Sequence, residues 1–553
     1  MKYLFFFLIT CCSYALVAQS TDLPLGSRAY TTYDEWDVKS ERSFFTTVKP
    51  ISRKEMSNIS KQVSDTKSIT KRFDQQYIKI ETREYQDSIN ESRKPVFGRF
   101  YGYNSDFVSV NQDGFDFHMN PVFGFRVGKE NNSGDLIFQN YRGLEMRGTI
   151  DDKVSFYSLL TENQARFPTY VRQVTDSTLG VPYEGFWKQY NETGVDFLRA
   201  QAYIDFNVSR HISAQFGYGK HFVGNGRRSL ILSDFGNNYP YLRLKTQVWK
   251  FQYTNIFAQL IAETRGGTFG LFGTGSFPKK YLAFHRLEVN LTKKLNIGLF
   301  ESVIYGKPDS LGNNGVRAQY LNPIIFYRAL EQQDGSADNA ILGMDFKWNL
   351  FKSISLYGQL VIDELIVSKA FSGDGYWENK QAFQLGAKYI NSFGIDGLML
   401  QAEWNQVRPY TYAHQDNYTS YSHYNMPLAH PLGANFREIL LSGNYRITPK
   451  LTASGELLLA KYGVDIGSLS YGGDILKSYN LKTGDVGIDL LQGDETSLML
   501  VHGKLSYQWF HNLFTDIDLT YRKESSVSGL SDLNSSIFSF TLRYNFPNRD
   551  YLF

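Results

Sequence analysis

The chain has 553 residues, of which 42% are hydrophobic and 16% aromatic, with 38 Tyr and 42 Phe, yet its mean hydropathy is −0.34. Its formal net charge of +3 is too close to neutral to indicate a nucleic-acid partner. Cys11 and Cys12 are the two cysteines, so the chain has no thiol left for a disulfide or a metal once an N-terminal signal is removed.

Residues 1–18 have the pattern of a cleaved secretory signal. Lys2 precedes an apolar run that extends from Tyr3 to Val17, and the small Ala18 comes next. A positive start, a short apolar centre and a small exit residue are typical of such signals. The run is also shorter than the roughly 20 residues of a membrane-spanning helix. A lipoprotein acylated at Cys11 is the alternative, which the preceding threonine disfavours. We therefore expect export across the inner membrane.

Residues 19–96 form a polar N-terminal region. The stretch 39–93 is rich in Lys, Arg, Glu and Ser and lacks strict alternation. Both short helices and an extended, partly ordered arm fit this pattern. We expect a periplasmic region that is partly helical.

Residues 97–553 are assigned to an all-β transmembrane barrel of the outer membrane, with clear alternation from about Phe115 onward. The last predicted strand alternates apolar Phe538, Phe540, Leu542, Tyr544 and Phe546 with Ser539, Thr541, Arg543 and Asn545. Successive side chains of a strand point to opposite faces, so one face fits lipid and the other a wet lumen. The many aromatic residues fit the girdles of such barrels. A soluble sandwich would instead have to bury the aromatic face against a second sheet.

The predicted connections alternate between short and long, as periplasmic turns and extracellular loops do. The long ones are 163–193, 220–239, 264–280, 307–339, 367–380, 408–435, 462–497 and 523–535. The short ones are 151–153, 209–212, 248–250, 293–294, 351–353, 391–397, 448–450 and 510–513. Residues 248–250 contain no typical turn residue. The pattern predicts about eighteen antiparallel strands with both termini in the periplasm.

The loop 220–239 is a candidate polysaccharide-binding segment. It contains Lys220, His221, Arg227, Arg228, Asn237 and Asn238 among several glycines. Guanidinium groups bind the carboxylates of acidic polysaccharides bidentately. The alternative, slightly favoured, is that the loop folds into the lumen and its arginines pair with acids on the inner wall. A barrel hydrolase would need Ser229 and His221 in contact, which nothing in the sequence indicates.

The loop 408–435 is the second candidate. It holds Tyr410, Tyr412, Asn417, Tyr418, Tyr421 and Tyr424. Tyrosine is apolar on its ring and polar at its tip, which suits sugar binding as well as packing over the barrel mouth, and both interpretations stay open. His414, His423 and His430 match no common zinc spacing, so no metal is expected.

A short helix is predicted at 320–331, inside the long loop 307–339. Pro323 suits a first helical turn. We expect this segment to plug the lumen, with Asn322, Phe326, Tyr327, Arg328 and Glu331 as candidate plug residues. On the hairpin that faces it, His285 and Glu301 fall on the apolar side of their strands, while Arg286 and Glu288 fall on the side of a predicted inner charge ladder.

Several stretches carry a family resemblance. They are residues 217–230 (GYGKHFVGNGRRSL), 232–235 (LSDF), 238–243 (NYPYLR), 284–288 (FHRLE), 320–323 (YLNP), 335–339 (GSADN) and 405–412 (NQVRPYTY). Together they resemble the capsule-assembly Wzi family of outer-membrane proteins, and its Bacteroidetes branch, often labelled as gliding-motility or RemB-like, over about residues 100–546. The resemblance implies a barrel of about eighteen strands that holds capsular or exopolysaccharide at the cell surface and does no chemistry on it.

The sequence thus predicts a non-catalytic outer-membrane barrel, without cofactor or metal, whose partners are surface polysaccharide, outer-membrane lipid and the barrel assembly machinery. Two alternatives stay open. One is a channel or transporter. The other is a barrel component of a secretion or gliding apparatus, with 19–96 docking periplasmic proteins.

Overall fold

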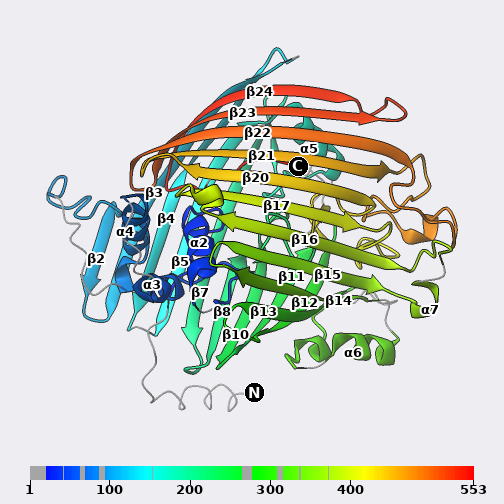
Figure 1. Cartoon of the computed structure of the whole chain (residues 1–553), viewed down its shortest axis with the longest axis horizontal. Coiled ribbons are helices and arrows are strands. Elements are labelled where there is room, and N and C mark those ends of the chain that lie inside the picture. The colour runs from blue at the N-terminus through cyan, green and yellow to red at the C-terminus, as the bar shows by residue number, and fades with distance from the viewer. Residues whose placement is uncertain are drawn as a thin grey trace.

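The computed structural model describes residues 20–41, 43–62, 69–85, 94–131, 133–151, 153–263, 277–307, 315–324, 326–335, 338–370, 373–547 and 549–553. The expected signal at 1–18 lies outside these residues and stays a prediction. Within them, the chain forms one closed antiparallel barrel of 18 long strands, which confirms the predicted fold class (Figure 1).

The barrel strands follow one another around the wall in chain order. They are β3 (Phe115–Glu130), β4 (Leu136–Ile150), β5 (Val154–Arg166), β7 (Gly194–Asn207), β8 (Ile212–Gly219), β10 (Tyr239–Val248), β11 (Phe251–Ile261), β12 (Lys279–Asn290), β13 (Leu295–Tyr305), β14 (Asn339–Leu350), β15 (Ile354–Glu364), β16 (Lys380–Ile390), β17 (Leu398–Val407), β20 (Phe436–Arg446), β21 (Leu451–Val464), β22 (Asp494–Phe510), β23 (Leu513–Ser526) and β24 (Leu533–Tyr544). β24 closes the barrel on β3, from Ile537 opposite Glu130 to Tyr544 opposite Phe123. The short strands β2 (Val108–Gln112) and β6 (Lys188–Tyr190) extend this wall at opposite ends of it.

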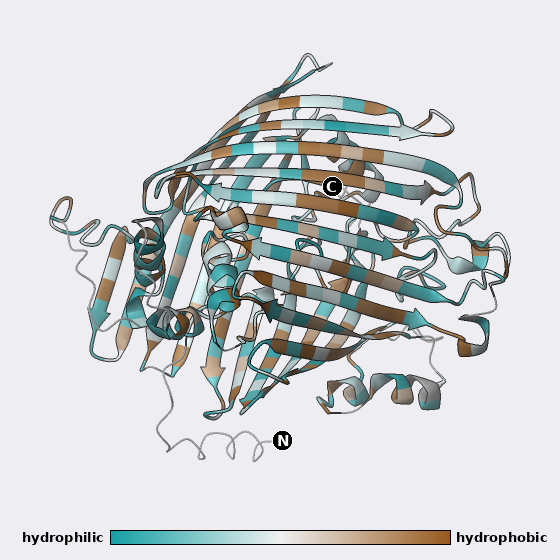
Figure 2. Ribbon diagram, in the orientation of Figure 1, coloured by the Kyte–Doolittle hydropathy of each residue, from teal (hydrophilic) through white to brown (hydrophobic). Residues whose placement is uncertain are grey.

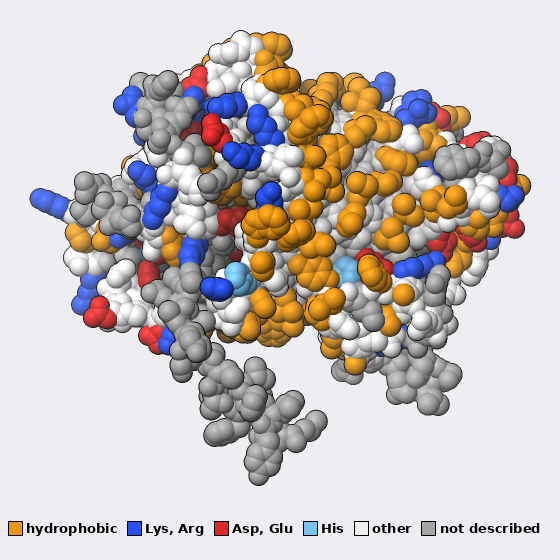
Figure 3. Space-filling view, turned by 60° about the horizontal axis from the view of Figure 1, so that its bottom comes forward, with side chains coloured by type: hydrophobic (Ala, Val, Ile, Leu, Met, Phe, Trp, Pro, Cys, Tyr) orange, Lys and Arg blue, Asp and Glu red, His pale blue; other side chains and the backbone are white. Residues whose placement is uncertain are grey.

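The alternation in the last strand assigns its two faces as expected. Phe538, Phe540 and Leu542 are exposed on the outer surface, while Ser539 and Thr541 are buried towards the lumen. Hydropathy alternates in the same way along the other strands (Figure 2). On the outside, hydrophobic side chains cover the middle of the barrel and charged ones gather towards its two ends (Figure 3). Phe546 is the exception: the chain leaves the sheet after Tyr544, and its ring stacks on Tyr141 inside the lumen.

The short connections lie at one end of the barrel and the long ones at the other, so the predicted alternation of short and long connections is confirmed. The connection between β23 and β24 is shorter than expected, residues 527–532, because both strands run further. Residues 249–250 do form a turn, in which Trp249 adopts a left-handed φ of 54°. Its ring is exposed, as is that of Phe351 in another short turn. Aromatic rings favour the membrane–water interface, which explains bulky residues where small ones are usual.

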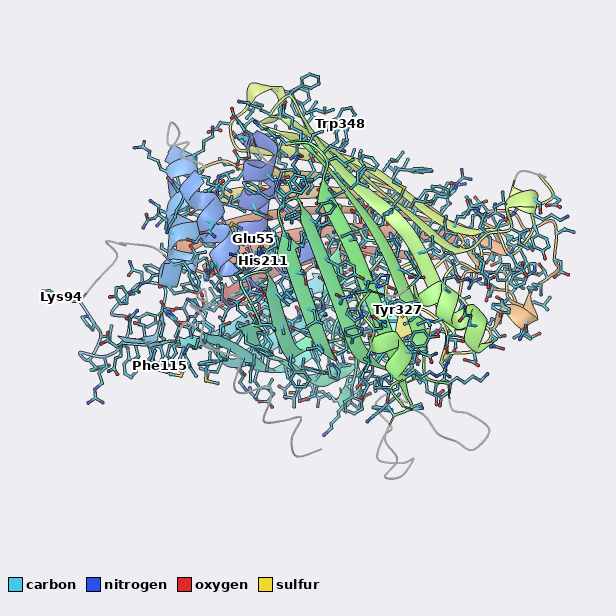
Figure 4. The ribbon with its side chains drawn as sticks, turned by 90° about the horizontal axis from the view of Figure 1, so that it is seen from below. Glu55, Lys94, Phe115, His211, Tyr327 and Trp348 are labelled. Atoms are coloured by element: carbon cyan, nitrogen blue, oxygen red, sulfur yellow. The ribbon has the colours of Figure 1, made fainter. Side chains whose placement is uncertain are left out.

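The N-terminal region lies in the short-turn end of the barrel and is partly helical, as predicted. It contains α2 (Ala29–Lys39), β1 (Val48–Lys49), α3 (Arg53–Gln62), α4 (Ile69–Glu81) and the 3₁₀ turn η1 (Arg83–Tyr85). The helices share a small core that includes Tyr33, Met56 and Ile78. In Figures 1 and 4 they lie at the end opposite the long loops. No described helix of the chain is long and apolar enough to cross a membrane.

Ion pairs attach this region to the inner wall. Asp22 contacts Arg243 of β10 at 2.9 Å, and Asp37 contacts Lys347 of β14 at 2.8 Å. Lys388 of β16 lies 2.6 Å from Asp34. Because each pair joins a helix or loop of the N-terminal region to a different strand, the region is fixed around the lumen instead of extending from it as a free arm.

Residues 545–547 and 549–553 return into the lumen. Asp550 lies 3.3 Å from Arg126 and also contacts Lys504, both on the inner wall. The ring of Phe553 packs on Tyr170 and Phe235, which belong to long loops. The expected periplasmic position is therefore wrong for residues 549–553, because this aromatic segment is buried inside the barrel.

The predicted plug helix is also misplaced. The segment 315–335 forms η3 (Ala318–Leu321) and α6 (Tyr327–Asp334), and it packs on the outer face of the wall (Figure 4). Tyr327 stacks on His285, and Glu301 accepts the backbone N–H groups of Tyr327 and Arg328 at 2.8 and 2.6 Å. Both partners point away from the lumen, since their neighbours Arg286 and Phe300 point into it.

The remaining plug candidates belong to the same segment and do not enter the lumen either. Asn322 accepts the backbone N–H of Ile324, and Phe326 is 75% exposed on the outside. The side chain of Glu331 lies outside the described part of the structure. The helix was expected inside because it has an apolar and a polar side and lies within a long loop. Instead, Tyr253 and Asn255 on the outer wall donate to the backbone carbonyl of Pro323, which precedes the helix.

Candidate functional site

The long-loop end of the barrel is filled by segments that fold inward from the rim. The loop 220–238, which contains β9 (Phe222–Val223), is one of them. Lys220 at its start donates to the carbonyls of Tyr183, Asp234 and Gly236 at 2.6, 3.2 and 2.8 Å. Burial holds the pKa of this lysine well below its usual range. Lys220 therefore links loop 163–193 to loop 220–238, and its ammonium group does not face solvent.

Arg227 and Arg228 reach the inner wall. Arg227 lies 3.0 Å from Glu456 of β21, and Arg228 lies 3.5 Å from Glu438 of β20. Their backbone N–H groups both donate to Glu403 of β17. The arginines thus pair with inner-wall acids, the structural alternative given above. Of these two side chains, that of Arg227 is about half exposed, at 49%, and that of Arg228 is buried.

The other predicted residues of this loop have structural partners as well. His221 is fully buried against Tyr239, and burial lowers its pKa well below the ordinary value. Asn238 donates to the carbonyl of Ala200, while Asn237 is half-buried and accepts the backbone N–H of Asn238. Ser229 donates to the carbonyl of Val223, so the structure does not bring it together with His221 as a nucleophile and base.

The tyrosines of loop 408–435 divide into two groups. Tyr410, Tyr412 and Tyr421 are fully buried, and their hydroxyls donate to the carbonyls of Ser470, Leu230 and Ile231. They are packing residues, because each ring is covered and each hydroxyl is already paired. Asn417, Tyr418 and Tyr424 are half-buried at the rim and could be reached from outside.

The three histidines of this loop do not form a metal site. His414 contacts Thr419 at 2.7 Å, His423 contacts Asn238, and His430 contacts Glu438 at 3.0 Å. The described residues do bring His502, Asp518 and Asp550 together. The ammonium of Lys504 lies 3.2 Å from Asp518 and also contacts Asp550, so a cation already occupies the position between these acids.

Two segments from opposite ends of the barrel meet inside it. β1 of the N-terminal region pairs with β9, Val48 opposite Val223. Asn225 bonds Thr46 and Thr47 at 2.7 and 3.0 Å. A chamber of about 500 Å³ borders these two segments, and it is lined by charged side chains of both signs, among them Arg228, Lys388, Glu145 and Asp550.

A smaller cavity of about 290 Å³ opens at the long-loop rim, and we call it the outer pocket. It lies between α5 (Thr169–Thr178) and the β6–β7 hairpin. The sequence reasoning missed it, although loop 163–193 was correctly placed. Its lining includes Arg172, Gln173 and Asp176 from the helix and Trp187, Glu192 and Thr193 from the hairpin. A tryptophan among amides and charges in a long loop was the available signal.

The outer pocket is positioned by buried contacts beneath α5. Tyr170 and Val171 are buried on the inner side of the helix, and the hydroxyl of Tyr170 donates to the carbonyl of Tyr551 at 2.5 Å. Residues three and four apart share a helix face. Because Tyr170 and Val171 point inward, Arg172, Gln173 and Asp176 are left to line the pocket.

Comparisons with known proteins agree on the fold. No family model matches the sequence, and no curated protein matches it. Among solved structures, Wzi of Escherichia coli is similar, with a TM-score of 0.57, 14% identity, and coverage of 97% of this chain and 100% of that chain. It is described as an outer-membrane protein involved in group 1 capsule assembly and a carbohydrate-binding β-barrel. OprD of Pseudomonas aeruginosa has a TM-score of 0.42 and 11% identity, with 77% and 94% of the two chains covered.

Proposed function

We propose that the protein is a non-catalytic barrel of the outer membrane that binds capsular or exopolysaccharide at the cell surface. The observation that carries this proposal is the filling of the lumen by the chain itself. A barrel filled from both ends provides a rigid membrane anchor, and the long loops are then the surface left for binding. The likeness to a carbohydrate-binding barrel over nearly the whole chain supports this function.

The loop face has the chemistry that glycans need. Half-buried Tyr418, Tyr424 and Asn417 lie at the rim, and the outer pocket adds Trp187 and Arg172. Aromatic rings stack on the apolar faces of sugars, and amides and guanidinium groups bond their hydroxyls. A nucleophile paired with a base is not assembled at Ser229 and His221, which supports binding without chemistry.

Cell-surface binding tests this proposal directly. Intact cells that display the protein should bind fluorescently labelled polysaccharide from the source organism, saturably and without permeabilisation. The control is the same strain without the protein. The purified barrel in detergent should bind the same polymer in a pull-down. Absence of binding in both formats contradicts the proposal.

Attachment of capsule and a role in gliding motility both belong to this proposal. Docking of a periplasmic or secretion partner through residues 19–96 stays a prediction. The described helices of that region pack in the lumen, so such a partner would meet their outward sides at the short-turn end.

A further inference from the structure

The outer pocket combines an aromatic ring with a small, polar enclosure. Trp187 is 8% exposed and packs in a core with Phe167 and Val195 at the pocket floor. Gln173 and Asp176 are exposed along the helix side, and Glu192 is exposed on the hairpin. A volume of about 290 Å³ is at the lower end of the roughly 300–1,000 Å³ of small-molecule sites. The pocket therefore fits a short unit and not the breadth of a folded polymer.

Three polar atoms in the pocket wall have no hydrogen-bond partner among the described residues. They are Nε of Arg172, Nε1 of Trp187 and Oγ1 of Thr193. Buried donors and acceptors are paired in the great majority of cases, so three orphaned atoms around one cavity need an explanation. All three belong to residues that line the pocket. A ligand carrying several hydroxyls supplies both donors and acceptors, which is the kind of partner that these atoms lack.

The charged side chains that line the pocket distinguish an uncharged sugar from an acidic one. Arg172 is the cationic residue of the lining, and it also donates to Thr169 at 3.2 Å, while Asp176 and Glu192 are both acidic. A sugar carboxylate would meet two like charges and one opposite charge. Hydroxyl groups can donate to the carboxylates and accept from the guanidinium without a charge conflict. The lining thus favours an uncharged sugar over a uronic acid.

We infer that the outer pocket receives one uncharged pyranose unit of the bound polysaccharide. Trp187 provides the apolar floor, and Arg172, Asp176 and Glu192 bond the ring hydroxyls. This inference rests on the proposed function and adds the site and the class of sugar. The loop 220–238, which the basic residues first indicated, then serves to fill the lumen and support the pocket through Phe235.

A pair of substitutions on one helix tests the site. Gln173→Trp places a large ring in the pocket from an exposed position, so folding should be unaffected. Ser177→Trp introduces the same ring at another exposed position of α5, which does not line the pocket. The probes are methyl glycosides of glucose, galactose and mannose together with glucuronate and galacturonate, titrated into the purified full-length barrel. At least one neutral glycoside should bind, and Gln173→Trp should weaken it by about tenfold or more while Ser177→Trp leaves it unchanged.

The outcomes separate this inference from the proposed function. Unchanged binding by Gln173→Trp, or a preference for the uronates, overturns the pocket assignment. So does absence of binding to every neutral glycoside. In each case the pull-down with intact polysaccharide still decides whether the barrel binds a glycan. Trp187→Phe keeps the ring in the core but removes its N–H, and it should weaken the neutral glycoside while leaving thermal stability close to that of the parent protein.

Discussion

At the scale of single residues, His423 shows how a buried histidine holds two loop segments in place. Its Nδ1 accepts the backbone N–H of Ile261 at 2.9 Å, and its Nε2 donates to the carbonyl of Asn238 at 3.2 Å. The bond at Nδ1 requires the neutral ring, because a protonated Nδ1 cannot accept a hydrogen bond. Burial lowers the pKa of His423 from 6.5 to about 3, so protonation is resisted while the loop is folded.

This geometry predicts that loop 408–435 loses stability in acid. The folded pKa lies below the unfolded one, so the unfolded loop binds more protons below pH 6.5. The stabilisation is complete above pH 6.5, and it falls by about 1.4 kcal/mol per pH unit as the pH drops towards 3. The thermal midpoint of the near-ultraviolet dichroism, to which the buried tyrosines of this loop contribute, should therefore be lower at pH 4.5 than at pH 7.

The substitution His423→Gln isolates this contribution. A glutamine can accept from Ile261 and donate to Asn238 but does not titrate. The variant should lose less stability between pH 7 and pH 4.5 than the parent, while the loss due to His414 and His430 remains. The same substitution at exposed His211, in a short turn outside this loop, is the control for a histidine-to-glutamine change elsewhere in the chain. A parent profile that is flat over this range would contradict the assignment.

The residue types in the two candidate loops were visible in the sequence, but their roles were not. Pairing of Arg227 and Arg228 with wall acids could be stated as an alternative, because alternation already placed acids on inner faces. Burial of Tyr412 could not be predicted. Its hydroxyl donates to Leu230, a residue 182 positions away, and only the folded barrel brings the two loops together.

At the scale of elements, the segment 315–335 covers polar groups on the outer wall. Helix α6 has no side-chain cap of its own, since its first residue follows Phe326. Glu301 of β13 supplies the missing acceptor from outside the helix, which satisfies two free N–H groups and favours the positive end of the helix dipole. Without the segment, Glu301 and His285 would face lipid.

Replacement of Glu301 by leucine should therefore release α6 from the wall. Two backbone donors lose their acceptor, which costs about 1–3 kcal/mol. Trypsin should cut at Arg328 faster in Glu301→Leu than in the parent protein in detergent, with the barrel itself intact. Leu299→Ala, an exposed substitution on the same face of β13, should leave the cleavage rate unchanged. Equal protection of the parent and Glu301→Leu would show that the cap does not hold the helix.

Strands were predictable because lipid on one face and water on the other impose a two-residue period on their side chains. The short turns could then be located because short and long connections alternate along the chain. The position of α6 was not predictable from the same pattern. Its polar residues indicated a wet lumen, whereas Tyr253, Asn255 and Glu301 form a polar patch on the outer wall that no single strand reveals. Likewise, Phe546 continues the apolar alternation in sequence, but the chain turns inward after Tyr544.

At the scale of the whole molecule, the lumen is filled from two directions. The N-terminal region occupies the short-turn end, and loops 220–238 and 408–435 occupy the long-loop end. Pairing of β1 with β9 joins the two fillings. Each is also attached to the wall through its own ion pairs: Asp22 and Asp37 hold the N-terminal region to β10 and β14, and Arg227 and Arg228 hold loop 220–238 to β21 and β20.

This double filling predicts that the intact barrel is silent in a planar bilayer. Removal of residues 20–85 alone should leave conductance low, because the loops still fill the other end. In the same deletion variant, replacement of residues 222–236 and of residues 409–434 by short glycine–serine linkers, together with removal of residues 549–553, should open a persistent pore. Heat-modifiable migration on a gel verifies that each variant has formed its barrel. Steady conductance of the intact protein would mean that ions find a path past both fillings, and a channel would then replace surface binding as the function that the architecture favours.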